Sequence, residues 1–247
     1  MTTRKEAAVA VSRMKHARIE TAAGVLEGEY DEGTVHTDEG TYAPEEYELL
    51  PPCEPSVLYC IGKNYDETID QMGYETPDDP TFFIKPPVSL HPPERPIPYP
   101  AFTSELTYAG ELAAVVDTAC KNVDEEEVDD VIRGYTILND LDCLDQESLA
   151  ARKAFDASGP LGPVVADVEP VGIEMTTHIN GELRQKDNTE SMLIKPREIV
   201  SFLSDRVTLR PGDVVSFGSP ANPGLLERGD EIEIRYEGIG TLRNTVV

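Results

Sequence analysis

Two strand-length stretches decide how this sequence is read: Gly110-Glu-Leu-Ala-Ala-Val-Val116 and Gly134-Tyr-Thr-Ile-Leu-Asn-Asp140. Both are mainly apolar, which is typical of buried strands. Glu111 opens the first stretch and Asp140 closes the second. If the two strands are neighbours, these carboxylates meet at one end of a sheet, where two carboxylates with water and substrate oxygens hold Mg2+ or Mn2+. Acids at strand ends are usually only solvated, so spacing alone leaves both interpretations open.

The segments around this pair favour further short strands. Residues 17–50 alternate β-type stretches with turn signals and predict a small antiparallel module. The proline-rich tract 85–100 predicts an ordered extended loop, because proline is excluded from helix interiors and central strands. Asn180-Gly181 predicts a tight hairpin. More strands are expected at 57–62, 176–179, 214–217, 231–236 and 241–247, a loop at 159–163, and helices at 124–132, 146–155 and 197–204, the last with Pro196 as its first residue.

The composition is strongly acidic and excludes some partners. The chain has 247 residues, with 47 Asp plus Glu against 21 Lys plus Arg, and a net charge of -26. Such a surface repels phosphates, so we expect neither nucleic acid nor membrane as a partner. The acids are interleaved with apolar residues, and 8 Lys stand against 13 Arg. Diffuse acids with few lysines indicate a halophilic surface, in which molar salt screens the repulsion.

The cysteine pattern and the lengths of the apolar runs predict a cytoplasmic protein with two folded parts. Its four cysteines form no CxxC pair and have no zinc-ligand spacing, which favours reduced thiols. No apolar run reaches the length of a membrane span, and no signal peptide is evident. We expect an α+β, mostly β fold. Its parts are a possible disordered extension at 1–13, a small N-terminal β module at 14–52 and a catalytic domain at 53–247.

Short motifs occur along the chain in an order that resembles the fumarylacetoacetate hydrolase family. Beside the two strands quoted above, they are Cys60-Ile-Gly-Lys-Asn-Tyr65, Phe82-Phe-Ile-Lys85, Lys153-Ala-Phe-Asp156, Gly159-Pro-Leu-Gly-Pro163, Leu209-Arg-Pro-Gly-Asp213, Gly218-Ser-Pro220 and Gly238-Ile-Gly240. The sequence resembles a divergent, haloarchaeal-type member from about residue 57 onward. The resemblance implies a mixed β-roll catalytic domain with short helices, a small N-terminal β module and a homodimer.

The resemblance also implies a chemistry. Members of the family bind Mg2+ or Mn2+ and act on small 2-oxo or 1,3-diketo acids by hydrolysis, decarboxylation, isomerisation or hydration. The metal chelates the substrate and stabilises an enolate. By position, Glu111 and Asp140 match metal ligands, and Lys153 matches the catalytic lysine that neutralises the enolate. The expected substrate contacts are Gly218, Ser219, Gln185 and, with packing as the alternative role, Tyr135.

Two departures concern the ligands of the metal and of the substrate. The usual Glu-x-Glu pair is Ala109-Gly-Glu111 here, so one anionic ligand is missing. Replacement acids are sought among Asp142, Glu105 and Glu147. Leu144 stands where the family commonly has an Arg, which removes a clamp for the substrate carboxylate.

A third departure concerns the catalytic base. The His and Glu that activate water in the hydrolases correspond to Thr68 and Gln71, neither of which is a base near neutral pH. Asp66, Glu67 and Asp70 on the same loop are alternative bases. These losses disfavour hydrolysis through the usual dyad and favour isomerisation or decarboxylation.

Two hypotheses of different kinds follow from these matches and departures. The first is a divalent-metal-dependent enzyme acting on a small oxo or enol acid. The alternative is a catalytically silent member that binds an organic acid or serves as an interaction scaffold.

Overall fold

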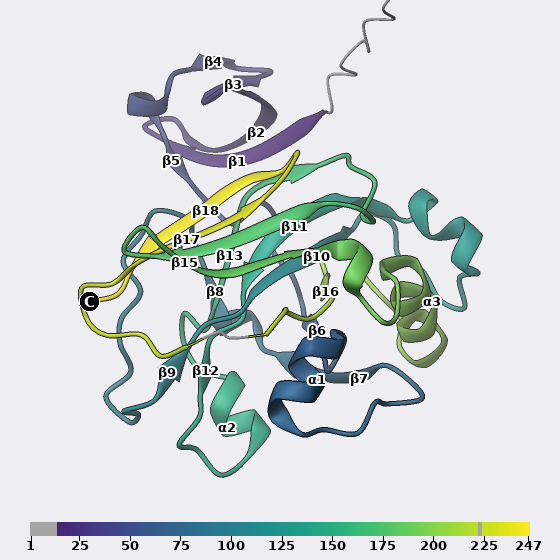
Figure 1. Ribbon diagram of the computed structural model, residues 1–247. Coiled ribbons are helices and arrows are strands. Elements are labelled where there is room, and N and C mark those ends of the chain that lie inside the picture. The colour runs from purple at the N-terminus through teal and green to yellow at the C-terminus, as the bar shows by residue number, and fades with distance from the viewer. Residues whose placement is uncertain (1–13, 222–223) are drawn as a thin grey trace, which may run out of the picture.

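The computed structural model describes residues 14–221 and 224–247, which form a mostly β body with short helices (Figure 1). The expected mostly β fold is therefore confirmed. The predicted extension at 1–13 lies outside the described residues. The helices are α1 (Asp66–Met72), α2 (Leu149–Lys153) and α3 (Pro196–Arg206), and the 3-10 turns are η1 (Pro44–Glu46), η2 (Pro87–Ser89), η3 (Glu125–Asp130) and η4 (Thr189–Ser191).

The largest sheet runs through the whole molecule. Its strands, in spatial order, are β4 (Gly40–Tyr42), β3 (Thr34–Thr37), β2 (Gly24–Asp31), β1 (Lys15–Thr21), β13 (Gly159–Ala166), β11 (Ile132–Asn139), β10 (Gly110–Val116), β16 (Val214–Ser216), β6 (Leu58–Gly62) and β7 (Thr81–Lys85). The short strands β5 (Glu48–Leu49) and β8 (Leu90–His91) pair with β1 and β13. Most neighbours are antiparallel, but β16 and β6 are parallel, so the sheet is mixed.

Two smaller sheets complete the body. One contains β15 (Glu182–Asn188), β14 (Glu174–Ile179), β17 (Glu231–Tyr236) and β18 (Gly240–Thr245), and the other pairs β9 (Leu106–Thr107) with β12 (Asp142–Cys143). The hairpin from β14 to β15 turns at Asn180 and Gly181, which both have positive φ. This turn confirms the hairpin expected from the Asn-Gly pair, because both central residues of such a turn need that conformation.

The strands β10 and β11 separate two apolar clusters. Leu112 and Ala114 belong to the main core, which includes Ile234 of the four-stranded sheet. Ala113 and Leu138 belong to a smaller cluster on the other face. Gly110 lies against the four-stranded sheet, since a Cβ there would be 2.8 Å from Ile234 Cγ2. Consequently the residue between Ala109 and Glu111 has no room for a side chain.

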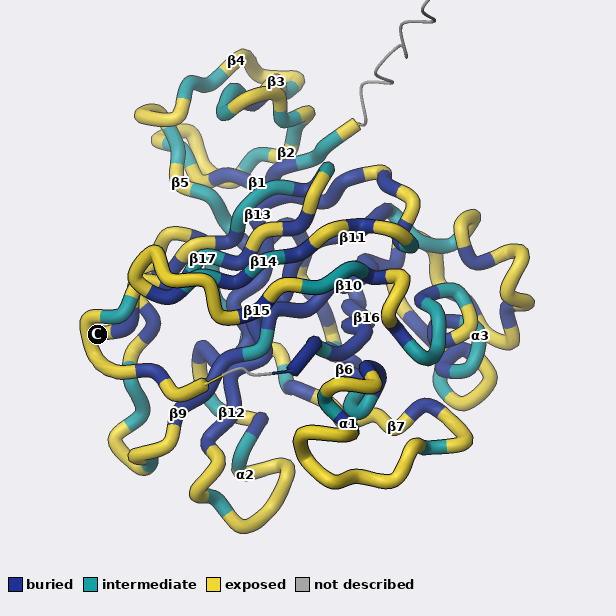
Figure 2. Tube along the Cα trace, viewed as in Figure 1, coloured by how far each residue is buried: buried dark blue, intermediate teal, exposed yellow. Residues whose placement is uncertain are grey.

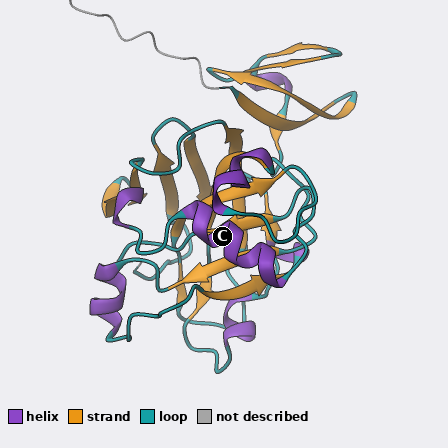
Figure 3. Ribbon diagram, turned by 90° about the vertical axis from the view of Figure 1, so that its right-hand side faces the viewer, coloured by secondary structure: helices purple, strands orange, loops and turns teal. Residues whose placement is uncertain are grey.

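The N-terminal module projects from the body and is largely exposed (Figures 2 and 3). It comprises β1 to β5 and is joined to the body where β1 pairs with β13, through Lys15 opposite Ala166 and His16 opposite Val165. Only a few of its apolar residues are buried, among them Ile19 and Val35. The division of the chain near residue 52 stays a prediction, because the large sheet continues across this joint.

Several expected elements are confirmed and others need correction. The helix after Pro196 and the strand beginning at Gly110 are confirmed as α3 and β10. The loop expected at 159–163 is wrong, because these residues begin β13. The pairing of β13 with β11 shifts register between Tyr135 and Ile137, and prolines are tolerated in sheets near such irregularities. The helix expected at 124–132 is the 3-10 turn η3, and that at 146–155 shrinks to α2.

The proline-rich tract is ordered, as expected. Ile97 is buried and its backbone bridges to Val246 near the C-terminus. Asn244 donates from its side chain to the carbonyls of Pro92 and Arg95 at 3.0 and 2.8 Å. These contacts tie the tract to the last strand. Within the described ranges, none of the helices has the length and apolar character needed to cross a membrane.

Candidate active site

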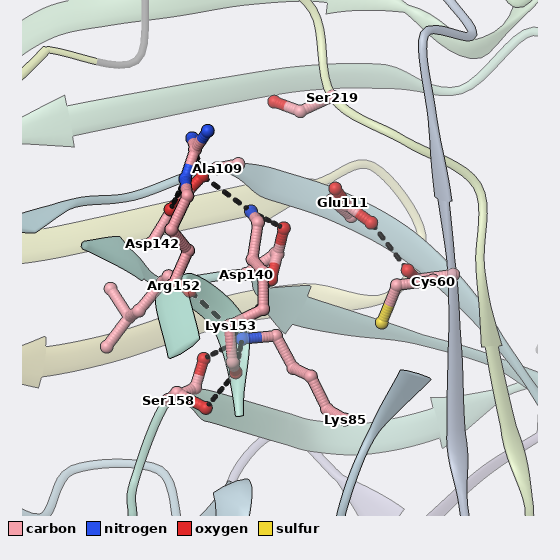
Figure 4. A network of polar contacts seen from close by, with 12 residues as sticks. Cys60, Lys85, Ala109, Glu111, Asp140, Asp142, Arg152, Lys153, Ser158 and Ser219 are labelled. Carbon is pink, nitrogen blue, oxygen red and sulfur yellow. Dashed lines mark hydrogen bonds and ion pairs between the residues drawn. The ribbon is translucent and has the colours of Figure 1, made fainter. Parts of the chain in front are cut away.

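Glu111 and Asp140 lie on one face of the β10–β11 pair, at the same end (Figure 4). The register places Glu111 opposite Leu138, and the amide of Asp140 donates to the carbonyl of Ala109 at 2.9 Å. Both side chains face the smaller apolar cluster and are almost fully buried, at 3% and 2% exposure. The predicted convergence of the two strand-end carboxylates is therefore present, and neither acid is a solvated strand end.

Asp140 lies between two ammonium groups. Lys153 Nζ donates to Asp140 Oδ2, and Lys85 Nζ lies 2.9 Å from Asp140 Oδ1. Burial by itself would raise the pKa of Asp140, but the charges of Lys153 and Lys85 outweigh burial and hold that pKa below its usual value. Asp140 is therefore a carboxylate throughout the physiological range.

Lys85 is anchored by the backbone rather than by Asp140 alone. It has no exposed surface, and its ammonium donates to the carbonyls of Leu141, Lys153 and Ser158 at 2.9, 2.8 and 2.9 Å. These three bonds use all three protons of the ammonium. Asp140 Oδ1 therefore meets the Lys85 ammonium as an ion pair at 2.9 Å and has no further polar partner among the described residues.

The hydrogen-bond donors described for Glu111 are neutral. Its Oε2 accepts from Ser216 Oγ at 2.5 Å and from the amide of Gly218 at 3.3 Å. Burial, followed by the negative charge of Asp140, raises the pKa of Glu111 to about 8. Cys60 lies on the neighbouring strand opposite Ser216, and burial raises the pKa of its thiol, so this cysteine adds no charge.

The short helix α2 supplies Lys153. Ser148 caps it, since its hydroxyl accepts from the amide of Ala151 at 3.2 Å. The last turn carries Arg152 and Lys153, and Lys153 Nζ also lies 3.2 Å from Asp142 Oδ2. Burial favours the neutral amine, but the carboxylates of Asp140 and Asp142 raise the pKa of Lys153 above its usual value. Lys153 therefore stays an ammonium, as the predicted role of electrostatic catalyst requires.

The turn at Gly218-Ser-Pro220 closes the same end of the sheet and is held by Gln185. The amide nitrogen of Gln185 donates to Ser219 Oγ and to the carbonyl of Pro220, both at 2.9 Å. Its oxygen accepts from Thr177 Oγ1 at 2.9 Å and from the amide of Gly110 at 3.3 Å. The structure thus brings Gly218, Ser219 and Gln185 to the site. Gln185 touches the turn, which identifies it as the group that positions Ser219.

Helix α1 carries the positions of the missing dyad. Thr68 Oγ1 donates to the carbonyl of Ser219 at 3.0 Å, so this side chain helps to hold the turn. Asn64, just before the helix, bonds the carbonyls of Ile194 and Phe217 at 3.0 and 2.9 Å. The alternative bases Asp66, Glu67 and Asp70 are all exposed. The hydroxyl at position 68 is therefore a structural donor.

Tyr135 is not at this site, which corrects its assignment as a substrate contact. It lies opposite Ala114, on the face of the sheet away from Glu111, and is buried in the main core. Its ring lies 6.3 Å from that of Phe217. The alternation of side chains along β11 explains this placement, because residue 135 and residue 138 point to opposite faces. Packing, the other role considered for Tyr135, is the one observed.

The replacement ligands are not brought together either. Glu105 and Glu147 are exposed on loops. Asp142 is buried, but it forms two bonds with Arg152, from Nε at 2.8 Å and from Nη2 at 2.5 Å. Across residues 14–221 and 224–247, no group of three or more His, Cys, Asp or Glu side chains is arranged to hold a metal ion.

Two carboxylates nevertheless fit a weakly held divalent cation. Among the described residues Asp140 Oδ1 meets only the Lys85 ammonium, and the Glu111 carboxylate is close enough for its charge state to depend on Asp140. The donors are all oxygens, which suit Mg2+ or Mn2+. Mg2+ is commonly bound through one or two carboxylates plus oxygens of the substrate. Glu111 and Asp140 are the residues that would hold such an ion.

Sequence reasoning assigned no role to several groups at this site. Lys85 ends one of the family motifs, and its ammonium lies against Asp140. A lysine ending an apolar run such as Phe82-Phe-Ile-Lys85 is a signal that could have identified it, because a lysine is rarely buried without a partner. Ser216 and Arg152 had no comparable signal, since serine and arginine are common at strand ends and on helices.

The fold and this site define a class of protein: a mixed β-roll with two carboxylates and two lysines at one end of its central sheet. The family model described as Fumarylacetoacetate (FAA) hydrolase C-terminal matches residues 57–247. The chain belongs to the fumarylacetoacetate hydrolase family.

Individual relatives are enzymes of small oxo acids. Oxaloacetate tautomerase YisK of Bacillus subtilis is 33% identical over 225 residues, which are 83% of this chain and 75% of the relative. The crystal structure of 2-hydroxyhepta-2,4-diene-1,7-dioate isomerase from Mycobacterium marinum has a TM-score of 0.88 and 34% identity, covering 95% of this chain and 98% of the other. That of fumarylpyruvate hydrolase from Pseudomonas aeruginosa, in complex with Mn2+ and pyruvate, has a TM-score of 0.74 and 27% identity, covering 82% and 92%.

Proposed function

We propose that this protein is a divalent-metal-dependent enzyme that isomerises a small 2-oxo or enol carboxylic acid through its enolate. One observation carries the proposal: a buried carboxylate, Asp140, lies between the ammonium groups of Lys153 and Lys85, beside a second carboxylate, Glu111. Charges are costly to bury, and perturbed groups of this kind are concentrated at functional sites. Relatives named as a tautomerase and an isomerase act on compounds of this class.

The proposed roles follow from position. Lys153 Nζ stabilises the negative charge that develops on the enolate oxygen, in a site where little water screens the interaction. Ser219, presented by Gln185, binds the substrate carboxylate through its hydroxyl. Mg2+ or Mn2+, held by Glu111 and Asp140, supplies Lewis-acid polarisation of the substrate oxygens when bound.

Isomerisation is favoured over hydrolysis by helix α1. Hydrolysis of a carbon–carbon bond needs a base that activates water. The hydroxyl of Thr68 is bonded to Ser219, and the acids near it on α1 are exposed. Enol–keto conversion moves a proton between the enol oxygen and C3, and solvent water can take up the first proton and deliver the second. The barrier falls when the lysines, and a metal if bound, stabilise the enolate between the two transfers. Decarboxylation through the same enolate is the second reaction compatible with these groups, and hydrolysis is the third.

The test is an assay of enol-to-keto conversion of oxaloacetate in molar KCl with Mn2+. We expect the wild-type protein to accelerate it and the chelator EDTA to abolish the effect. Lys153→Met removes the enolate-stabilising charge and is expected to lower kcat by about 10²–10³. Lys195→Met is the matched control and should leave the rate unchanged, because the bonds of Lys195 within the described residues go to the backbone carbonyls of Glu190 and Met192.

The alternative is a silent member that serves as an organic-acid-binding or interaction scaffold. For a silent member we expect oxalate or pyruvate to bind. The enol-to-keto conversion of oxaloacetate would then be no faster with the wild-type protein than with buffer or with Lys153→Met. That result would reject the enzyme and retain the scaffold. This alternative is supported by two replacements. Ala109 stands where the family has a metal-binding glutamate, and Thr68 stands where the hydrolases have a catalytic histidine.

The remaining proposals concern the state of the whole protein. We infer a homodimer from the family resemblance, to be checked by light scattering in high salt. The net charge of -26 supports a halophilic, haloarchaeal-type protein, whose melting temperature should rise from low to molar KCl. The four cysteines of the chain are unpaired and buried, which supports a cytoplasmic location.

A further inference from the structure

A cavity of about 260 Å³ lies where the residues after β9, the β14–β15 hairpin and the segment before β17 meet. Its described lining contains neither the carboxylates nor the lysines of the proposed active site. Two of the lining side chains are buried and the others are more open to solvent, so the cavity connects to the surface. The lining residues that matter here are Tyr108, Ile179, Arg184, Gly224, Glu227 and Asp230.

The hydroxyl of Tyr108 has no hydrogen-bond partner among the described residues, although Tyr108 is only 1% exposed. A Cβ on Gly224, which lines the cavity, would be 3.4 Å from this hydroxyl, so the hydroxyl lies at the cavity wall. Buried hydroxyls almost always have a partner, because an unpaired one has lost its bonds to water. Burial raises the pKa of Tyr108 to about 12, so the hydroxyl keeps its proton and can donate to an acceptor in the cavity.

Arg184 is presented to the cavity by an irregularity in β15. The register of β14 against β15 shifts between Thr177 and His178, which leaves Arg184 without an opposite residue. Such a bulge changes the direction of the side chain that it carries. Arg184 Nη2 donates to Glu182 at 2.8 Å, and the other two nitrogens of the guanidinium have no partner in the described part of the chain. A positive charge with free donors is therefore available to an anionic group.

The opposite charge comes from Glu227 and Asp230. Asp230 is fixed, since its two oxygens accept from Asn180 Nδ2 and from the amide of Glu227, both at 2.7 Å. The Glu227 carboxylate has no ion pair or hydrogen bond within residues 14–221 and 224–247. After burial, the charges of Arg184 and Asp230 shift the pKa of Tyr108 in opposite directions, so both charges lie near its hydroxyl. The cavity thus presents a cation and carboxylates together.

We propose that this cavity binds a small zwitterion, an α-amino acid, with its carboxylate on Arg184 and Tyr108 and its ammonium on Glu227. An anion alone would meet the carboxylates of a chain of net charge -26. A cation alone would leave the hydroxyl and the guanidinium donors unpaired. A ligand with both charges satisfies both sides, and the guanidinium fork matches a carboxylate. Ile179 provides an apolar wall for a short side chain. The site is additional to the proposed catalysis and does not depend on it.

Isothermal titration in molar KCl, with L-alanine as the probe, tests the proposal. We expect alanine to bind, and propionate and ethylamine, which each lack one of its charges, to bind at least about tenfold more weakly. Tyr108→Phe and Arg184→Gln should each weaken alanine binding about tenfold. Arg243→Gln is the matched control and should leave binding unchanged, because the Arg243 side chain is also 47% exposed and also pairs with a glutamate of the four-stranded sheet.

Tyr108→Phe also separates binding from folding. Without ligand this variant should be at least as stable as wild type, because it removes an unpaired buried hydroxyl and keeps the ring. Alanine should raise the Tm of the wild-type protein more than that of the variant. The proposal would be overturned by no alanine binding up to about 10 mM, by equal binding of propionate or ethylamine, or by unchanged binding in Tyr108→Phe. Displacement of alanine by oxalate with Mn2+ would also overturn it, because the ligand would then occupy the active site.

Discussion

The two buried carboxylates of the site, Glu111 and Asp140, have the same depth and opposite surroundings. Asp140 is enclosed by the ammonium groups of Lys85 and Lys153, whereas Glu111 meets a hydroxyl and a backbone amide. Burial pushes both pKa values upward, yet only that of Glu111 rises, to about 8, while that of Asp140 falls below its usual value. Local cations thus decide the charge of a buried acid, and position at a strand end does not.

Because their surroundings differ, Asp140 and Glu111 suit different functions. The Asp140 side holds permanent charges and is suited to bind and polarise an anion. The Glu111 side is nearly neutral without a cation. A divalent cation held there as proposed would favour the ionised acid, so its binding would release a proton from Glu111.

Removing the charge of Asp140 should have the largest effect on stability. Asp140→Asn keeps the shape but leaves Lys85, which has no exposed surface, without its carboxylate. We expect the free energy of unfolding to fall by about 3–5 kcal/mol, the usual effect of uncovering a buried charge. Urea unfolding in molar KCl measures it. Glu233→Gln, which breaks the exposed pair with Arg243, should cost less than about 1 kcal/mol. Equal losses in the two variants would contradict the picture of a buried charge cluster.

The pH dependence of stability should isolate Glu111. Its folded pKa of about 8 exceeds the usual glutamate pKa of 4.5, so the folded state holds a proton that the unfolded chain releases. The free energy of unfolding should therefore decrease as pH rises from about 4.5 to about 8, and then level off. Glu111→Gln cannot titrate. Across this pH window the stability of Glu111→Gln relative to wild type should increase by about a few kcal/mol, because the raised pKa of Glu111 corresponds to a free energy of that order.

Measurements of urea unfolding at several pH values, with EDTA present, provide this comparison. Added Mn2+ should flatten the dependence in the wild-type protein, since the cation favours the ionised form of Glu111. A constant difference between wild type and Glu111→Gln from pH 5 to 8 would show that this acid does not titrate in that range.

The smallest expected effect restores a charge at position 109. Ala109→Glu places a third carboxylate beside Asp140 and Glu111, and affinity for a divalent cation increases with the number of charged ligands. We expect Mn2+ to bind about tenfold more tightly, measured by the electron paramagnetic resonance signal of free Mn2+. Ala109→Gln is the neutral control of the same size and should not tighten binding. Weaker Mn2+ binding in Ala109→Glu than in Ala109→Gln would contradict the assignment of the metal site.

Much of the fold could be predicted because its signals are local. The apolar runs of β10 and β11, Pro196 at the start of α3 and Asn180-Gly181 in the hairpin each act within a few residues. The errors arose where distant contacts override local preference. Proline and glycine at 159–163 favour a loop, but pairing with β11 and β8 makes them part of β13.

The amino-acid sequence by itself determined the chemical inventory: an acidic chain, two carboxylates at strand ends, a lysine at 153 and an alanine at 109. Only the tertiary structure decided how these groups act on one another. It brought Lys85 and α2 to Asp140, gave Glu111 neutral hydrogen-bond donors and turned Tyr135 to the far face. The physical reason is that burial, charge pairing and pKa depend on neighbours that are far apart in the chain and meet only when the sheets pack.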